Sequence, residues 1–173
     1  MTIAAVAGSC GRNQPVAAQD VSAALPVAVE ARVGSTREAK LALGRVSVRD
    51  RASPAAWQVE IAERPGDISH GLMFRRTLDS DRGMIFLMPK DNDWAFYMRN
   101  TYVALDMVFI DRNWRVVGVA ANTRPLTETH HQSGRPCRYV LELAAHQARK
   151  TGIVVGTRLE LQRLPAGPSE GSR

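Results

Sequence analysis

The sequence predicts a mainly β protein, folded as one compact β-sandwich or barrel of the jelly-roll type with one or two short helices. From residue 41 onward, short apolar runs alternate with turn residues roughly every 8–12 positions, which is typical of all-β domains. Glycine, proline, asparagine and aspartate, the residues that favour turns, separate the runs. At 173 residues with 45% hydrophobic content, the chain has room for one domain with a substantial core.

Eight segments have the composition of strands, and Trp57–Ala62 shows the alternation best. Its apolar side chains at positions 57, 59 and 61 share one face, while polar residues occupy the other. Turns are expected at Arg82-Gly83, Asp91-Asn92-Asp93 and Asp111-Arg112-Asn113. The predicted strands are Leu41–Arg49, Trp57–Ala62, Met84–Met88, Trp94–Met98, Leu105–Ile110, Val116–Ala120, Tyr139–Leu143 and Arg158–Leu161.

Two short helices are expected between these strands. The first covers Pro65–His70, where a proline at the first position suits a helix start. The second covers Ala144–Gly152, in which Gly152 fits the residue that ends a helix.

The first forty residues differ from the rest, because they are rich in alanine and valine and lack periodicity. The segment Thr2–Cys10 resembles the end of a lipoprotein signal, and a lipid on Cys10 would tether the protein to a membrane face. Cleavage after Val16-Ala17-Ala18 would instead give a soluble secreted product, and a disordered cytoplasmic N-terminus is the further alternative. We therefore expect export, to the periplasm or to a membrane face.

These observations divide the chain into three parts. Residues 1–40 are predicted to be a signal-like, lipoprotein-like or disordered leader, and residues 41–164 the folded β domain. Residues 165–173 lack apolar side chains other than alanine and are predicted to be a disordered tail.

Charge and motifs favour some function classes over others. The formal net charge of +6 comes from scattered arginines rather than a dense block, so the sequence does not favour nucleic-acid binding. No apolar run is long enough to span a membrane. The sequence has no Gly-x-Ser-x-Gly, no His-Glu-x-x-His and no phosphate-binding glycine loop, so it does not indicate an enzyme.

No cofactor or metal is predicted. Five methionines lie between residues 73 and 107, and they fit core filling better than a Cu(I) site with His70. His130 and His131 have no evident third ligand. Cys137 is predicted to be a small buried apolar residue rather than a nucleophile.

A cluster of polar residues around Asp106 is the candidate site. Asp106 lies inside an apolar strand, and a buried carboxylate needs a partner, which Arg75 or Arg99 is expected to supply. Glu142 is a second acid in a similar apolar strand. The candidate ligand-binding residues are Arg75, Arg99, Asn100, Thr101, Asp106 and Glu142.

This cluster has three interpretations. In the first, a polar pocket near Arg99, Asn100 and Asp106 binds a small polar molecule or a segment of a partner protein, and the chain is an exported binding or accessory module. In the second, the chain is a purely structural interaction protein, and these residues form a buried ion-pair network that only holds the strand register, which is the commoner use of such residues. In the third, Asp106 and Glu142 form the paired carboxylates of a hydrolase.

Seven blocks in one collinear series carry a family resemblance. They are Val59–Ala62, Gly71–Arg75, Gly83–Phe86, Phe96–Thr101, Leu105–Asp111, Asn122–Glu128 and Tyr139–Leu143. In this order and spacing they resemble the DUF192 family of bacteria and archaea, from Trp57 to Leu161. The resemblance implies a compact β fold with minor helices, and it implies no activity, because the biochemical function of that family is not established. Ala104 departs from the family pattern, which often has proline before Leu-Asp.

Overall fold

The computed structural model describes residues 40–49 and 55–165. Most of the predicted leader, including Cys10, and the tail from residue 166 lie outside these residues. None of the helices in the described ranges is long and apolar enough to cross a membrane. The elements are β1 (Ala42–Val48), β2 (Ala56–Ala62), α1 (Pro65–His70), β3 (Arg82–Asn92), β4 (Leu105–Ile110), β5 (Val116–Thr123), β6 (Cys137–Ala144), α2 (Gln147–Thr151) and β7 (Leu159–Arg163).

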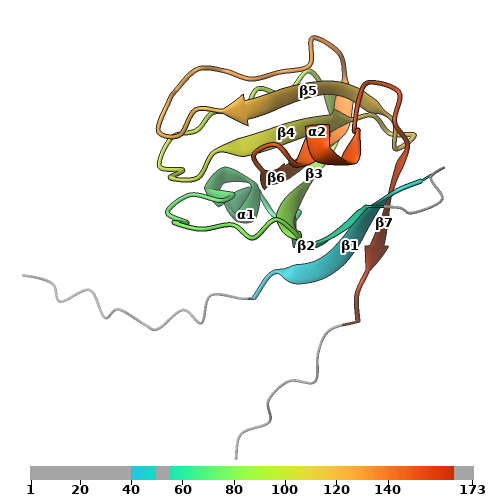
Figure 1. Ribbon diagram of the computed structural model, residues 1–173, viewed down its shortest axis with the longest axis horizontal. Helices are drawn as coiled ribbons and strands as arrows, with labels where there is room; N and C mark the ends of the chain where they lie inside the picture. Colours follow the sequence, from blue (N-terminus) through green and yellow to red (C-terminus); the bar gives the residue numbers. More distant parts are fainter. Residues whose placement is uncertain (1–39, 50–54, 166–173) are drawn as a thin grey trace, which may run out of the picture. The chain divides into compact units, whose positions relative to one another are not determined.

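All seven strands form one sheet in the order β5-β4-β6-β3-β2-β1-β7 (Figure 1). Neighbouring strands are antiparallel except β2 and β3, which are parallel. The starts of the edge strands β5 and β7 meet at an isolated bridge between Arg115 and Arg158, and the sheet is not closed into a barrel. The prediction of a mainly β single domain with two short helices is confirmed.

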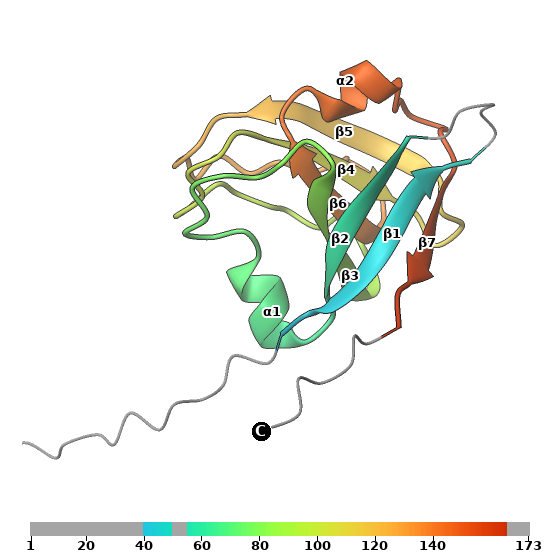
Figure 2. The same cartoon turned by 60° about the horizontal axis from the view of Figure 1, so that its bottom comes forward.

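Side chains of the sheet alternate between two apolar clusters, one on each face. In β3, Ile85 belongs to the first cluster, whereas Met84 and Phe86 belong to the second. Ala148 of α2 packs into the first cluster and Ile68 of α1 packs against the second. Figure 2 shows the two helices on opposite sides of the domain. Each helix therefore covers a different face of the sheet.

One predicted strand, Trp94–Met98, is not a strand. Only Phe96 pairs, through an isolated bridge in which its N–H and C=O bond the backbone of His131 at 2.9 and 2.8 Å. Trp94 and Phe96 instead pack against the second cluster. The segment therefore covers the sheet rather than extending it.

Gly83 lies inside β3, not in the turn that its sequence context predicts, and it leaves no room for a side chain. A Cβ placed there would lie 2.5 Å from the carbonyl oxygen of Glu142 and 2.9 Å from Cδ2 of Leu143. We expect Gly83→Ala to lower the free energy of unfolding by about 1–3 kcal/mol, because β3 and β6 must move apart. Urea unfolding would measure this loss.

Gly66 provides the matched control, because no atom lies within 4 Å of a Cβ placed there. Gly66 lies in α1, where alanine is the better helix former, so Gly66→Ala should be neutral or slightly stabilising. Equal losses of stability in the two variants would contradict the steric explanation.

Candidate functional site

The strand register separates the two acids of the candidate site. Asp106 pairs with Leu143, and Met107 pairs with Glu142, so the two carboxyl groups leave the sheet on opposite faces. Asp106 faces α2, where it accepts a hydrogen bond from the backbone of Ala148. The interpretation of Asp106 and Glu142 as the paired carboxylates of a hydrolase is therefore wrong.

Asp106 has a structural role. Its side chain is fully buried. Oδ1 accepts the backbone N–H of Asn122 and Oδ2 accepts that of Ala148, each at 2.8 Å. These bonds join β4 to the end of β5 and to the start of α2. The prediction of an arginine partner is wrong, because two backbone amides satisfy the carboxyl group.

The two arginines of the candidate site pair with other acids. Arg75 donates a hydrogen bond to the carboxylate of Glu60. Nε of Arg99 donates to Oε1 of Glu128 at 2.9 Å on the exposed surface, and this bond lowers the pKa of Glu128. The six predicted residues therefore do not gather around Asp106.

Glu142 is the buried acid without a partner. The residue is 5% exposed, and no residue in the described ranges donates a hydrogen bond or offers a charge to its carboxyl group. Its register neighbours on the same face are Met84 of β3 and Met107 of β4. Burial raises the pKa of Glu142 to about 8, so the carboxyl group is mostly protonated at neutral pH.

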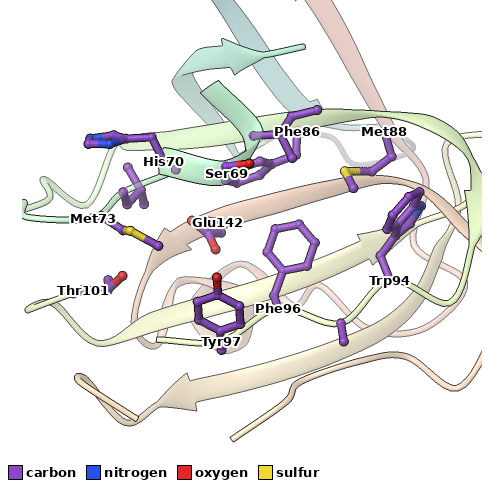
Figure 3. A pocket seen from close by; sticks show the side chains of 14 residues that line it. Ser69, His70, Met73, Phe86, Met88, Trp94, Phe96, Tyr97, Thr101 and Glu142 are labelled. Carbon is purple, nitrogen blue, oxygen red and sulfur yellow. The ribbon is translucent and has the colours of Figure 1, made fainter. Parts of the chain in front are cut away.

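Glu142 lines a pocket of about 220 Å³, which we call the Glu142 pocket. In Figure 3 the Glu142 carboxyl group points into the space between Met73, Phe96 and Tyr97. Of the six predicted residues, only Glu142 and Thr101 line this pocket. The lining residues are Ile68, Ser69, His70, Gly71, Leu72, Met73, Phe86, Met88, Trp94, Ala95, Phe96, Tyr97, Thr101 and Glu142.

The lining is mostly apolar and aromatic, and it contains no lysine or arginine. Its titratable side chains are His70, Tyr97 and Glu142. The rings of Phe86 and Phe96 meet edge to face, with centroids 5.1 Å apart. A few polar groups within an aromatic wall is the composition that small-molecule sites favour.

Three residues with left-handed backbone conformations lie around Asn100 and Thr101. Phe74, Asn100 and Leu126 all have positive φ angles, of 65°, 55° and 58°. The N–H of Phe74 donates to the carbonyl of Asn100 at 2.7 Å, and the N–H of Leu126 donates to that of Thr101 at 3.1 Å. Left-handed conformations at non-glycine residues concentrate at functional sites. The carbonyl of Asn100 thus ties this loop to Phe74, while ligand binding by the Asn100 side chain stays a prediction.

The methionines and Cys137 are divided between core and pocket. Met84, Met88, Met98 and Met107 are buried in the second cluster, as the core interpretation predicted, and Met88 also lines the Glu142 pocket together with Met73. Cys137 is a buried free thiol, and burial raises its pKa, which disfavours a nucleophilic role. The described part of the chain holds no group of three or more histidine, cysteine, aspartate or glutamate residues arranged around a metal.

Comparisons with known proteins identify the family. The model of DUF192, described as "Uncharacterized ACR", matches residues 45–161, which is more than half of the 173 residues. The chain belongs to the DUF192 family. The matched range of this DUF192 chain includes all of the Glu142 pocket. The chain has no match among curated proteins.

Two solved structures resemble this DUF192 domain. One is a protein of Sinorhizobium meliloti 1021 designated "putative transcription regulator", with a TM-score of 0.68 and 34% identity, covering 71% of this chain and 96% of that one. The other is a protein of unknown function from Novosphingobium aromaticivorans DSM 12444, with a TM-score of 0.65 and 34% identity, covering 68% of this chain and 84% of that one. The likeness supports the fold and leaves the activity open.

Proposed function

We propose that this DUF192 domain is a binding module whose Glu142 pocket takes a small, mostly apolar molecule carrying one polar group. The observation that carries the proposal is Glu142, a residue that is 5% exposed and whose carboxyl group has no partner in the described ranges and lies in the wall of a mostly apolar pocket. The Glu142 oxygens are not sealed from solvent, because the one side-chain atom in the described ranges that is both sealed and without a hydrogen-bond partner is Nε2 of His131. The pocket therefore leaves the unpaired carboxyl group of Glu142 accessible to a ligand that can bond it.

An enzymatic role is less well supported by the same pocket. Its lining includes Ser69, His70 and Thr101, but no hydrogen bond within the described ranges joins His70 to a hydroxyl or to Glu142. A side-chain nucleophile is normally activated by a base within hydrogen-bond reach. An acid with a perturbed pKa in a cleft can serve ligand recognition as well as catalysis. Recognition does not require an activated nucleophile beside it.

The setting of this module is part of the proposal. The leader is compatible with export and with a lipid on Cys10, which would tether the domain to a membrane face. The designation of the Sinorhizobium protein raises regulation of transcription as an alternative, but the scattered arginines of this chain form no dense basic block. The ligand is therefore proposed to be a small molecule and not a nucleic acid.

NMR of the tryptophan indoles tests the pocket directly. Trp94 lines it and donates its indole N–H to the carbonyl of Lys90 at 3.0 Å. Trp57 is buried in the first cluster, and Trp114 stacks on Tyr139. We expect at least one of benzyl alcohol, benzylamine and benzamide to shift the Trp94 signal at millimolar concentration, and to leave the other two indole signals in place.

Two phenylalanine variants provide the control. Ser69 lines the pocket, whereas Ser80 is exposed and does not. Ser69→Phe should occupy the space and reduce the Trp94 shift at least tenfold, while Ser80→Phe should leave it unchanged. The proposal fails if none of the three probes moves Trp94, or if Ser69→Phe binds them as well as the wild type does.

A further inference from the structure

We propose that the ligand of the Glu142 pocket is an organic ammonium ion, held by the Glu142 carboxylate and the surrounding aromatic rings. This inference rests on the proposed function and narrows it to one chemical class. It follows from three features of the pocket: the charge that is absent from its lining, the aromatic composition of its wall and the position of its single acid.

The Glu142 carboxyl group has no positively charged side chain beside it in the pocket lining. The pocket lining contains no lysine or arginine. The two arginines that the sequence offered as partners pair with other acids, Arg75 with Glu60 and Arg99 with Glu128. Arg99 also lies over the ring of Tyr97, 5.2 Å from its centroid, but is not part of the pocket lining. An anionic ligand would therefore find no fixed cation in the pocket, whereas an ammonium ion would supply the charge that a buried carboxylate requires.

The wall of the pocket suits a cation with a hydrocarbon coat. Four of its residues are aromatic: Phe86, Trp94, Phe96 and Tyr97. Aromatic faces attract cations, and clusters of such rings recognise quaternary ammonium ligands. The methyl groups of such a ligand would also contact the thioethers of Met73 and Met88. The volume of about 220 Å³ limits the ligand to a small ion.

Binding of an ammonium ion requires the carboxyl group to lose its proton. The ion enters, the Glu142 O–H releases H⁺ to solvent, and the resulting carboxylate pairs with the cation, so that one proton leaves for each ion bound. Affinity should therefore rise with pH, since ionisation before binding removes this cost. With a pKa of about 8, the ionised share of Glu142 increases about tenfold between pH 7 and pH 9.

Other titratable groups around Glu142 are few. His70 faces the pocket from the end of α1, and Tyr97 faces it from the segment that covers the sheet. The strands on either side place Met84 and Met107 next to Glu142 and no charged residue. A pH dependence of binding between pH 7 and pH 9 can therefore be assigned with variants of Glu142 and His70.

Choline and its neutral isostere 3,3-dimethylbutan-1-ol test the inference, because they share a shape and differ in charge. Isothermal titration calorimetry at pH 7 and pH 9 would measure both affinities, and two buffers of different ionisation enthalpy would count the protons released. At pH 9 we expect choline to bind at least tenfold more tightly than the alcohol. Its affinity should rise about tenfold from pH 7 to pH 9, with about one proton released per ion at pH 7.

Two variants locate the effect. Glu142→Gln should remove both the preference for choline and its pH dependence, while the alcohol still binds. His70→Gln should keep the tenfold rise. The comparison of choline with the alcohol in the wild type needs no variant, so it stands even if Glu142→Gln does not fold.

The outcomes separate the two proposals. If the alcohol binds as tightly as choline at both pH values, or if choline and benzylamine fail while benzyl alcohol or benzamide shifts Trp94, the ammonium inference is overturned and the binding module stands. If choline, the alcohol and all three benzyl probes fail, both proposals are overturned. A tenfold preference that persists in Glu142→Gln would also overturn the inference.

Discussion

Glu142→Gln is expected to stabilise this DUF192 domain at alkaline pH and to leave its stability at pH 4.5 almost unchanged. The carboxyl group has a pKa of about 8 in the folded protein and about 4.5 when exposed. Below pH 4.5 it is protonated in both states. Between pH 4.5 and pH 8 only the unfolded chain releases the proton, so the free energy of unfolding falls by about 1.4 kcal/mol per pH unit.

The full loss reaches about 3–5 kcal/mol above pH 8, where Glu142 is ionised in a pocket without a counter-charge. Glutamine has the same shape and does not ionise, so the variant avoids this loss. Urea unfolding at pH 5, 7 and 9 would measure it as the difference between variant and wild type, in which the titration of all other groups cancels.

Glu128→Gln is the control for this prediction. Glu128 is exposed and its pKa is lowered by the hydrogen bond from Arg99, so its contribution to stability changes only below about pH 4.5. The control should therefore keep the wild-type slope from pH 5 to pH 9. The prediction is wrong if Glu142→Gln keeps that slope as well.

Local patterns in the sequence were sufficient for most of the fold. The alternation of β2 is visible in Trp57–Ala62, and the apolar run of β4 in Leu105–Ile110 is as buried as a central strand requires. Trp94–Met98 has the same composition as a strand but lies over the sheet. Whether this segment joins the sheet or covers it depends on contacts with residues distant in sequence, such as the bridge between Phe96 and His131. Composition alone does not distinguish these two uses of an apolar segment.

The candidate site was predictable in part, for a related reason. An acid inside an apolar strand stands out in any sequence, and both Asp106 and Glu142 were identified by that signal. The face on which each acid lies depends on strand register, and the paired residues of β4 and β6 are 29 (Ile110 and Tyr139) to 39 (Leu105 and Ala144) positions apart in sequence. Arginine partners are also long-range: Arg99 pairs with Glu128, and Arg75 with Glu60. The sequence identified the aromatic residues of the pocket wall only as residues of the core, and not as part of a pocket.

Asp106→Asn is expected to lower the free energy of unfolding by about 2–4 kcal/mol. Each oxygen of the buried Asp106 carboxyl group accepts a different backbone N–H, from Asn122 and from Ala148. Asparagine keeps one acceptor oxygen and places an NH₂ group against the other N–H. One buried hydrogen bond is lost and two donors face each other, and each buried unsatisfied group costs about 1–3 kcal/mol. Urea unfolding at pH 7 would measure the loss.

Asp111→Asn is the matched control, because the same substitution there removes no acceptor that is in use. One oxygen, Oδ1 of Asp111, accepts both backbone bonds, from Asn113 at 2.8 Å and from Arg115 at 2.9 Å. The asparagine amide oxygen can take both, so the cost should stay below about 1 kcal/mol. A loss at position 106 no larger than that at 111 would mean that the two bonds of Asp106 do not hold α2 and β5 to β4. Asp106 would then be a candidate for binding chemistry after all.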